Sequence, residues 1–560
     1  MTFFPKQSTL LVFFIVLAIR LENALTITTF FQPDEYFQSL ELAAAWRNTG
    51  GYVTWEWMQA IRSTFYPRIF DSVYFIADTT AKKWNISPAT NAELLVVAPK
   101  LIGAVTAAIG DVYTGLLAKK IWGPDAGQYA LLFSICSAWN WFCSTRTFSN
   151  CLETTLTIVS MTYWPWKSYS TRDLTLASFF AALAFTVRPT NGLITWAIGP
   201  LLLKQLSSFS QRAFAVVHIA IVSAIVIFAN ALLDSKLYGR ITLPFIEFYR
   251  LNVTQSIAEF YGVSPWHYYY SQGLPLLLTG YLPLALFSLY RGFSSPSFAA
   301  RHLVLLANIV PIAFMTTRHK EVRFLYPLLP IFHVLMAGVG MPALPQRWSK
   351  VWVIVGMVAL NLPIAYYTAY VHQRGVVDVA NWLRKEHYAL SVPPATLGED
   401  WDILDAKYKA RVGFLMPCHS TPWGSYMWEA IRRNHTTSGP QPNAWFLTCE
   451  PPLGIPIEDR RSYLDEADQF YANTTEFLMQ WFGTPPVLAV GEKGYAQGGI
   501  DRNKRWPEKL VTFEATAALV EGYLRIGEPD CGYKECNRFF NSHFHDDWRR
   551  KGDVIVWCLR

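Results

Sequence analysis

Charged residues are scarce in this chain. Asp, Glu, Lys and Arg make up 16% of its 560 residues, against about 25% in an average soluble domain. The shortage is confined to residues 1–372, of which 11% are charged, whereas 25% of residues 373–560 are charged. The first part therefore lacks the surface of a water-soluble domain. The sequence predicts a multispan membrane domain at 1–372 and a soluble α/β domain at 373–560.

The signatures of several enzyme classes are missing. The sequence has no Gly-x4-Gly-Lys-Ser/Thr phosphate loop, no His-Glu-x2-His zinc motif and no Gly-x-Ser-x-Gly nucleophile elbow. Cysteine is limited to eight residues. Three of them lie in or beside apolar runs and five lie after residue 400, where disulfides are expected but the sequence leaves the pairing open.

Long apolar runs, by contrast, are abundant. A helix needs about 20 apolar residues to cross a bilayer, and eleven runs qualify as predicted spans. The fifth and sixth are short and meet at Arg188-Pro189, so they could also be one broken helix that lines a cavity. The predicted spans are 9–29, 93–118, 125–143, 151–166, 174–187, 189–203, 213–234, 269–290, 301–316, 324–345 and 351–372.

The charges between these runs predict the orientation of the chain. With the N-terminus in the cytosol, the cytosolic loops collect paired Lys and Arg residues, as the positive-inside rule requires. The net charge of +7 thus indicates membrane-flanking charge and not nucleic-acid binding. The loop 30–92 and all residues after 372 then lie in the lumen. So do the four predicted N-glycosylation sites, Asn85, Asn252, Asn434 and Asn473.

Two adjacent carboxylates, Asp34 and Glu35, follow the first predicted span. Acidic residues are rare in this part of the chain, and a carboxylate where a lipid-borne substrate presents its head group suits a general base. The alternative is structural, with Asp34 capping a helix over Glu35–Trp46. Both interpretations are compatible with the sequence.

Aromatic residues surround a further carboxylate and an arginine in the same loop. Trp55, Glu56, Trp57 and Arg62 are predicted to contact the acceptor sugar, since rings stack on sugar faces and charged groups bind hydroxyls. An aromatic belt at the membrane interface is the alternative, and composition alone favours it.

Basic residues on the lumenal side form a third group. One interpretation is ordinary membrane-flanking charge. The positive-inside rule places such charges in the cytosol, so a lumenal position also suits a function, for which a lipid phosphate is a suitable ligand. The sequence leaves both open. The predicted donor-binding residues are Arg188, Arg240, His319 and Arg323.

Three segments together resemble glycosyltransferase family 22, the multispan, dolichyl-phosphate-mannose-dependent mannosyltransferases of the endoplasmic reticulum. They are Pro33–Glu41, Thr54–Trp57 and His319–Phe324. Leu415–Pro422, Leu447–Pro452 and Asp465–Tyr471 resemble more narrowly the members that act in GPI-anchor biosynthesis. The resemblance extends from about residue 20 to 490.

This resemblance implies a GT-C fold, a multispan helix bundle with catalysis on the lumenal side. It implies transfer of the third mannose from dolichyl-phosphate-mannose to the two-mannose GPI precursor in α-1,2 linkage, with inversion. The catalytic role is carried over to Asp34, with Glu35 as its neighbour. Because phosphate is a good leaving group and basic residues are close by, we predict neither metal nor cofactor.

Other functions remain open at this point. A sister enzyme that extends the lipid-linked N-glycan precursor, or one that adds a fourth GPI mannose, would share the core and differ in acceptor. A multispan lipid or solute transporter is the alternative from another class. Transporters tend to show paired repeats with polar groups at the bilayer midplane, and this sequence shows neither.

Overall fold

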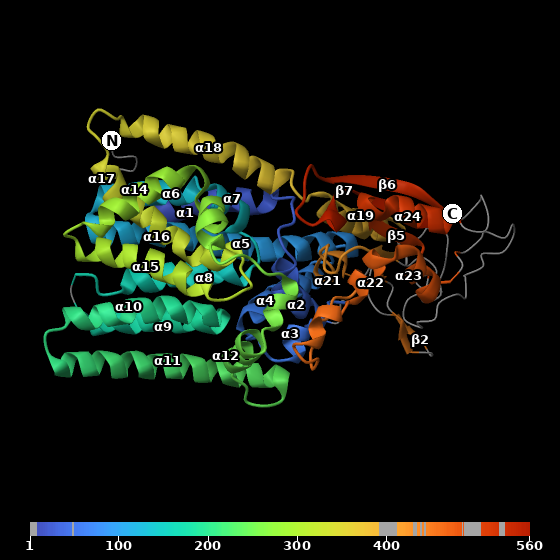
Figure 1. Ribbon diagram of the computed structural model, residues 1–560, viewed down its shortest axis with the longest axis horizontal. Helices are drawn as coiled ribbons and strands as arrows, with labels where there is room; N and C mark the ends of the chain where they lie inside the picture. The colour runs from blue at the N-terminus through green and yellow to red at the C-terminus, as the bar shows by residue number, and fades with distance from the viewer. Residues whose placement is uncertain are drawn as a thin grey trace. The chain divides into compact units, whose positions relative to one another are not determined.

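The computed structural model describes residues 8–47, 50–167, 169–390, 412–428, 434–436, 439–441, 444–483, 485, 506–525 and 532–559. The chain divides into two compact units (Figure 1). The helical unit comprises Met1–Ile27, Glu56–Arg68 and Pro99–Ala369, and the sheet-bearing unit comprises Thr28–Trp55, Ile69–Ala98 and Tyr370–Arg560. The second unit is thus assembled from three stretches, whereas the sequence predicted one boundary near residue 372.

The helical unit is a bundle of long apolar helices. Its longer helices are α1 (Thr9–Thr26), α5 (Pro88–Trp122), α6 (Pro124–Ile135), α8 (Ser149–Tyr163), α9 (Thr171–Val187), α10 (Gly192–Gln205), α11 (Phe209–Tyr238), α14 (Leu282–Phe293), α15 (Phe298–Met315) and α18 (Lys350–Tyr370). The part of α5 before Pro99 belongs to the sheet-bearing unit. Short elements complete it: α7 (Ala138–Cys143), α12 (Pro244–Tyr249), η3 (Arg250–Thr254), η4 (Ile257–Tyr261), η5 (Tyr269–Gly273), α13 (Leu274–Leu278), η6 (Thr279–Tyr281), η7 (Val322–Leu328), α16 (Leu329–Leu335), η8 (Met336–Gly340) and α17 (Met341–Ala343).

Among the described residues, seven helical segments are long and apolar enough to cross a membrane. The other four predicted spans contain α6, α8, α9 and α10, which have 12, 15, 17 and 14 residues. These are shorter than the usual spanning length of about 17–25 residues or at its lower limit. The total of eleven spans therefore stays a prediction.

The predicted interruption at Arg188 is present. Helix α9 ends at Val187, the 3₁₀ turn η2 spans Pro189–Asn191, and α10 starts at Gly192. Proline disfavours the helical conformation in the residue before it, and Arg188 indeed has an extended backbone. In Figure 1, α9 lies side by side with α10 and α11.

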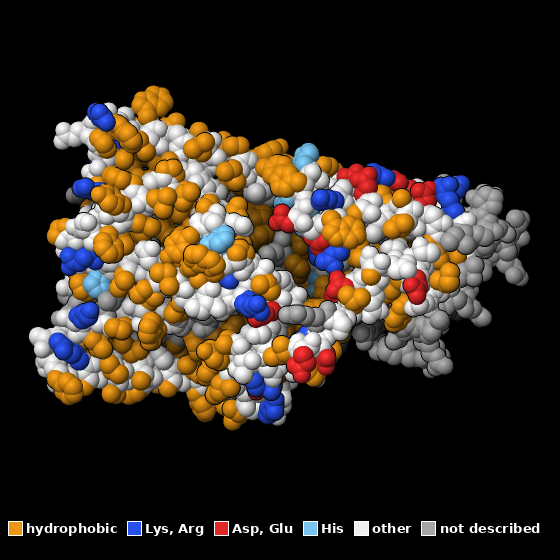
Figure 2. All heavy atoms as spheres, viewed as in Figure 1, with side chains coloured by type: hydrophobic (Ala, Val, Ile, Leu, Met, Phe, Trp, Pro, Cys, Tyr) orange, Lys and Arg blue, Asp and Glu red, His pale blue; other side chains and the backbone are white. Residues whose placement is uncertain are grey.

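Buried polar groups connect the first helices of the bundle. Arg20 of α1 forms a fully buried ion pair with Asp111 of α5, 2.6 Å between Nε and Oδ2, and also donates to the Ser134 carbonyl. Asp111 accepts a further hydrogen bond from the Ser134 hydroxyl. Buried charges persist in proteins when they are paired and hydrogen-bonded. Hydrophobic side chains dominate the visible surface of the bundle (Figure 2), as expected for a bilayer-facing protein.

The sheet-bearing unit combines a five-stranded mixed sheet with helices. Its helical elements include η1 (Tyr36–Leu40), α2 (Glu41–Trp46), most of α4 (Phe65–Lys83), α19 (Gly375–Leu390), α21 (Gly424–Met427), α22 (Glu466–Ala472), α23 (Thr474–Trp481) and α24 (Glu514–Leu524). Its strands are β1 (Val412–Leu415), β2 (Asn434–Thr436), β3 (Gly439–Gln441), β4 (Ala444–Phe446), β5 (Lys509–Phe513), β6 (Tyr533–Ser542) and β7 (Gly552–Leu559).

The large sheet has the order β4-β1-β5-β7-β6, and β2 pairs separately with β3. Strands β4, β1 and β5 are parallel, whereas β7 is antiparallel to both β5 and β6. Strands β1 and β5 are buried along their whole length, although β5 includes Lys509 and Thr512, and such burial is typical of inner strands of a sheet that is covered on both faces. The core packs aromatic side chains of α22, α23 and α24 against this sheet, including Phe470, Phe477 and Tyr523.

Two disulfides answer the question of cysteine pairing for four of the five late cysteines. Cys418 pairs with Cys449, and Cys536 on β6 pairs with Cys558 on β7. Cys531 lies outside the described residues. The three earlier cysteines, Cys136, Cys143 and Cys151, are free thiols in the helical unit.

Candidate active site

Asp34 starts the helix that carries η1 and α2. Pro33 fixes the approach, and its carbonyl accepts the backbone N–H groups of Tyr36 and Phe37. The Gln38 amide, one turn later, donates to Asp34 Oδ2. Asp34 is partly exposed, whereas Glu35 is buried. The helix expected over Glu35–Trp46 is present, but Asp34 already lies within its first turn and does not precede it as a cap, and the catalytic role of Asp34 stays a prediction.

The turn after Asp34 is a π-helix, η1, in which the chain forms wider turns than an α-helix. Such turns occur frequently at functional sites because they re-aim side chains within a helix. Phe37, in this segment, packs on His419 from the loop after β1, with ring centroids 4.0 Å apart. Tyr52 and Phe446 complete the ring contacts of His419.

His419 lies close enough to Asp34 to feel its charge. Burial lowers the pKa of the imidazole to about 3, and Arg550 acts in the same direction, whereas the Asp34 carboxylate raises it. The ring is therefore neutral at neutral pH. His419 also has a positive φ of 54°, a conformation that is uncommon outside glycine, and the adjacent Cys418 is held by its disulfide to Cys449.

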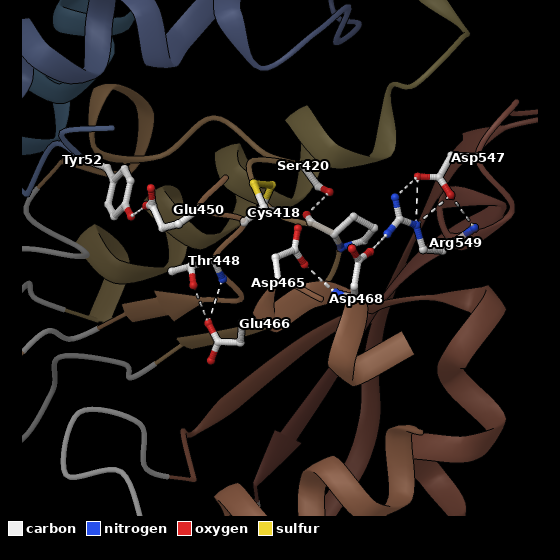
Figure 3. The surroundings of a disulfide bond; sticks show 12 residues. Tyr52, Cys418, Ser420, Thr448, Glu450, Asp465, Glu466, Asp468, Asp547 and Arg549 are labelled. Carbon is white, nitrogen blue, oxygen red and sulfur yellow. Dashed lines mark hydrogen bonds and ion pairs between the residues drawn. A yellow bond between two sulfur atoms is a disulfide. The ribbon is translucent and has the colours of Figure 1, made fainter. Parts of the chain in front are cut away.

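The loop residues around this disulfide are fixed by charged groups (Figure 3). Arg550 donates to the Ser420 hydroxyl (2.8 Å) and to the Cys418 carbonyl (3.4 Å). Arg549 pairs with Asp547 and with Asp468, at 2.9 and 2.8 Å. On the other side of the disulfide, Glu450 accepts a hydrogen bond from the Tyr52 hydroxyl at 3.1 Å. The small space beside Phe37, Trp423 and His419 has room for about one water molecule and not for a sugar ring.

Glu41 joins the helix of Asp34 to the C-terminal segment. Its fully buried carboxylate accepts the backbone N–H groups of Trp423, Gly424 and Ser425 at 3.3, 2.9 and 3.0 Å, and the Ser425 hydroxyl at 2.6 Å. A fifth donor is the Tyr52 N–H, at 3.3 Å. Burial raises the pKa of Glu41, while these hydrogen bonds lower it.

Glycine is required where these segments meet. A Cβ at Gly51 would lie 2.2 Å from the Glu41 carbonyl oxygen, and a Cβ at Gly424 would lie 2.6 Å from the Gly51 backbone. Neither distance is sterically allowed, so the segments around Glu41, Gly51 and Gly424 pack backbone against backbone.

In the helical unit, three predicted donor-binding residues gather around one ring. Arg188 and Arg323 lie 5.6 and 5.9 Å from the centroid of Phe324, and the His319 ring lies 5.9 Å from it. The sequence separates Arg188 from the other two by more than 130 residues, so the fold brings them together. The predicted Arg240 is exposed and is not among the described side chains that surround Phe324.

Each cation of this group has an acidic partner. Arg188 pairs with Glu153 at 3.3 Å, and Arg323 binds Glu321 through two hydrogen bonds of 2.6 and 2.9 Å. His319 contacts the same Glu321 at 3.0 Å. Burial lowers the pKa of His319, but the hydrogen bond to Glu321, the charge of Glu321 and the hydrogen bond to the Gly262 carbonyl together outweigh it, so the pKa is raised.

The residues predicted to contact the acceptor sugar have other surroundings. Trp55 and Trp57 are buried, so their faces are not open for stacking. Glu56 and Arg62 form an ion pair at 2.6 Å. Sequence reasoning overlooked Glu41, Glu153 and His419. Glu41 and His419 lie in segments that carried the family resemblance, and Glu153 carried a different signal, that of a single acidic residue inside an apolar run.

The sequons differ in accessibility. Asn85 and Asn473 are exposed and Asn252 is partly exposed, whereas the side chain of Asn434 lies outside the described part. Their glycosylation stays a prediction, as does the absence of a metal. Cys418, His419 and Cys449 lie close together, but both sulfurs are consumed by the disulfide. One feature weighs against the metal prediction: Asp400-Trp401-Asp402 is an Asp-x-Asp motif, and it lies outside the described residues.

Comparison with known proteins decides the family. The profile of the Alg9-like mannosyltransferase family matches residues 11–428. The chain belongs to this family. The prediction of a glycosyltransferase is thereby confirmed. The matched region ends at Trp428, the last residue of the segment that Glu41 holds, and so includes Asp34, Arg188, Arg323 and His419.

Named relatives extend over nearly the whole chain. GPI mannosyltransferase 3 of Yarrowia lipolytica is 38% identical, covering 97% of this chain and 96% of its own. The Aspergillus fumigatus protein of the same name is 36% identical, and the match covers 97% of this chain and 76% of that protein. GPI alpha-1,2-mannosyltransferase 3 of Mus musculus is 32% identical, covering 98% and 88%. These names agree with the narrower prediction from the sequence.

Solved structures confirm the predicted GT-C architecture. ArnT from Cupriavidus metallidurans, crystallised with undecaprenyl phosphate, superposes with a TM-score of 0.52 at 11% identity, covering 98% of this chain and 97% of its own. The apo oligosaccharyltransferase of Archaeoglobus fulgidus gives 0.50 at 11% identity, covering 99% and 76%. At such identity the likeness concerns the fold alone.

Proposed function

We propose that this chain adds the third mannose to the GPI precursor, in α-1,2 linkage, with dolichyl-phosphate-mannose as the donor. The observation that carries this proposal is the full-length relationship to GPI mannosyltransferases 3, one of which is named an α-1,2-mannosyltransferase. The relationship continues beyond residue 428, where the family-wide match stops. A sister enzyme with an N-glycan acceptor would share the family and not this full-length similarity.

In the proposed reaction, Asp34 is the general base. The donor has a β linkage and the product an α linkage, so one displacement with inversion suffices. Asp34 takes the proton of the acceptor 2-hydroxyl while that oxygen attacks the anomeric carbon, through an oxocarbenium-like transition state. The partly exposed position of the carboxylate supports this role, because an acceptor hydroxyl can reach it there. Glu35 is buried beside it and is the less accessible of the two.

The leaving group is a lipid phosphate, whose developing charge requires fixed cations. We assign this role to Arg188, His319 and Arg323 of the helical unit and not to the exposed Arg240. Glu153 and Glu321 hold the guanidinium groups in place before the donor binds, which is the preorganisation that transition-state stabilisation requires. No metal or cofactor is needed for these steps.

We further propose that both units act at the endoplasmic reticulum membrane, with Asp34 and the sheet-bearing unit in the lumen. The four sequons and the distribution of Lys and Arg support this orientation.

The decisive experiment is analysis of GPI precursors in cells that lack this protein. We expect a two-mannose precursor to accumulate and wild-type protein to remove it. Normal GPI precursors together with a truncated lipid-linked N-glycan would move the enzyme to the other pathway. If neither pool changes, the mannosyltransferase proposal is wrong.

Replacement of Arg323 tests the donor site. We expect Arg323→Gln to raise the KM for dolichyl-phosphate-mannose roughly 10-fold or more, because a charge-assisted hydrogen bond is lost. The KM for the acceptor should stay within about twofold. Arg318→Gln is the matched control, since Arg318 lies in the same loop but is exposed and pairs with Glu259. An unchanged donor KM would remove Arg323 from the phosphate site.

A further inference from the structure

Two segments of the sheet-bearing unit contact the loop that carries Asp34. His419, from the loop after β1, stacks on Phe37, one turn after Asp34. Glu450, from the loop after β4, accepts a hydrogen bond from Tyr52. The two loops are cross-linked directly, because the disulfide Cys418–Cys449 joins the residues immediately before His419 and Glu450. Figure 3 shows the Tyr52–Glu450 bond beside this disulfide.

These residues are not fully enclosed. Tyr52, His419 and Glu450 are all partly exposed, like Asp34 itself. His419 contacts its neighbours through its ring. Its nitrogens form no hydrogen bond with any described residue. A neutral imidazole both donates and accepts, a phenol does the same, and a carboxylate accepts. This combination beside aromatic rings matches the hydroxyl pattern of a sugar.

The position of the disulfide in the sequence adds an independent argument. Cys418 and His419 lie inside the region that the whole family matches, 11–428. Cys449 and Glu450 lie beyond it, in a part that the longer similarity to GPI mannosyltransferases 3 covers. The disulfide therefore attaches a segment outside the family-wide region to the surroundings of the shared Asp34. Enzymes that share donor chemistry and differ in acceptor are expected to differ at such a place.

We propose that Tyr52, His419 and Glu450 form the acceptor-binding side of the site and hydrogen-bond the hydroxyls of the mannose that receives the new sugar. The Cys418–Cys449 disulfide keeps His419 and Glu450 at fixed positions relative to Asp34. This inference rests on the proposed function, since it assumes a mannose-bearing lipid acceptor. The enclosed space next to His419 holds about one water, so the sugar contacts the partly exposed sides of these residues.

The test is steady-state kinetics of purified full-length enzyme with dolichyl-phosphate-mannose and a two-mannose GPI acceptor. Tyr52→Phe removes one hydroxyl, Glu450→Gln removes the charge at constant shape, and His419→Asn keeps a residue type that tolerates positive φ. We expect each variant to raise the acceptor KM roughly 5- to 10-fold. The donor KM should stay within about twofold. Cys418→Ser with Cys449→Ser should raise the acceptor KM as well.

Glu466→Gln is the matched control. Glu466 also accepts two hydrogen bonds near the same disulfide, from the Thr448 N–H and hydroxyl, and both of these donors belong to the same late part of the chain as Glu466 itself. We expect its acceptor KM to be unchanged. The inference is overturned if Tyr52→Phe and Glu450→Gln leave the acceptor KM unchanged, or if the donor KM rises equally. If instead the wild-type enzyme does not use this acceptor, the proposed function fails, and the two failures are thereby distinguished.

Discussion

Asp34→Asn is expected to abolish mannosyl transfer while the protein still folds and inserts. The amide has the size of the carboxylate but cannot take a proton from the acceptor hydroxyl, and general-base catalysis contributes about 10²–10⁴-fold. The Gln38 amide, which donates to Asp34, tolerates an Asn oxygen in its place, so little stability is lost. We expect kcat to fall by roughly 10³-fold with both KM values nearly unchanged.

The matched control for this prediction is Asp78→Asn. Asp78 forms an exposed pair with Lys82 four residues later, and such pairs contribute little to stability. Its activity should equal that of the wild type. If Asp34→Asn instead retains more than about a tenth of the wild-type rate, the base is another group. The adjacent Glu35 would then be the first to replace.

Glu41→Gln should produce the largest loss of stability among single substitutions in the sheet-bearing unit. The carboxylate accepts five hydrogen bonds from buried donors. A glutamine retains one acceptor oxygen and turns an amide N–H₂ toward backbone N–H groups that then have no acceptor. Leaving buried donors unsatisfied costs about 1–3 kcal/mol each, so we expect a loss of about 3–5 kcal/mol.

Thermal unfolding of the detergent-solubilised protein measures this effect. A loss of that size should lower the Tm by roughly 5–15 °C in a unit of this length. Glu466→Gln, which removes an acceptor for two donors, should lower it by less than half as much. Equal Tm values for Glu41→Gln and the wild type would show that the segment Trp423–Ser425 is held by its packing alone. Gly424→Ala would then be the variant that unfolds the unit.

The sequence predicted what depends on local pattern. Apolar runs and the proline after Arg188 were sufficient to place α9 and α10 and the break between them. The carboxylates after Pro33 and the basic loop at His319 were recognised because they are unusual for their surroundings. Arg188 and Arg323 were predicted separately to bind the donor, and only the fold shows that they share the Phe324 ring.

Contacts between residues far apart in the sequence could not be predicted from local sequence patterns. Nothing near Glu41 indicates that its partners follow 382 residues later. The disulfide pairing and the contact of His419 with Phe37 depend on the same return of the chain. Trp55 and Trp57 were expected to stack on sugar, yet both are buried, because an aromatic-rich segment has the same composition in a core and in a binding site.

The partnership between Glu41 and the segment Trp423–Ser425 sets an order for biosynthesis. At about 5–20 residues per second, the ribosome reaches residue 425 roughly 20–80 s after it has made Glu41. During that interval the loop that carries Asp34 has already been synthesised after the first span. The buried carboxylate of Glu41 still lacks the hydrogen-bond donors of residues 423–425. The segment that carries Asp34 and Glu41 is thus synthesised first within the sheet-bearing unit, yet Glu41 obtains its partners only after residue 425 has been made. In a nascent or truncated chain that ends before residue 423, the Glu41 carboxylate has no such donors, and chaperones encounter this segment in an incompletely folded state.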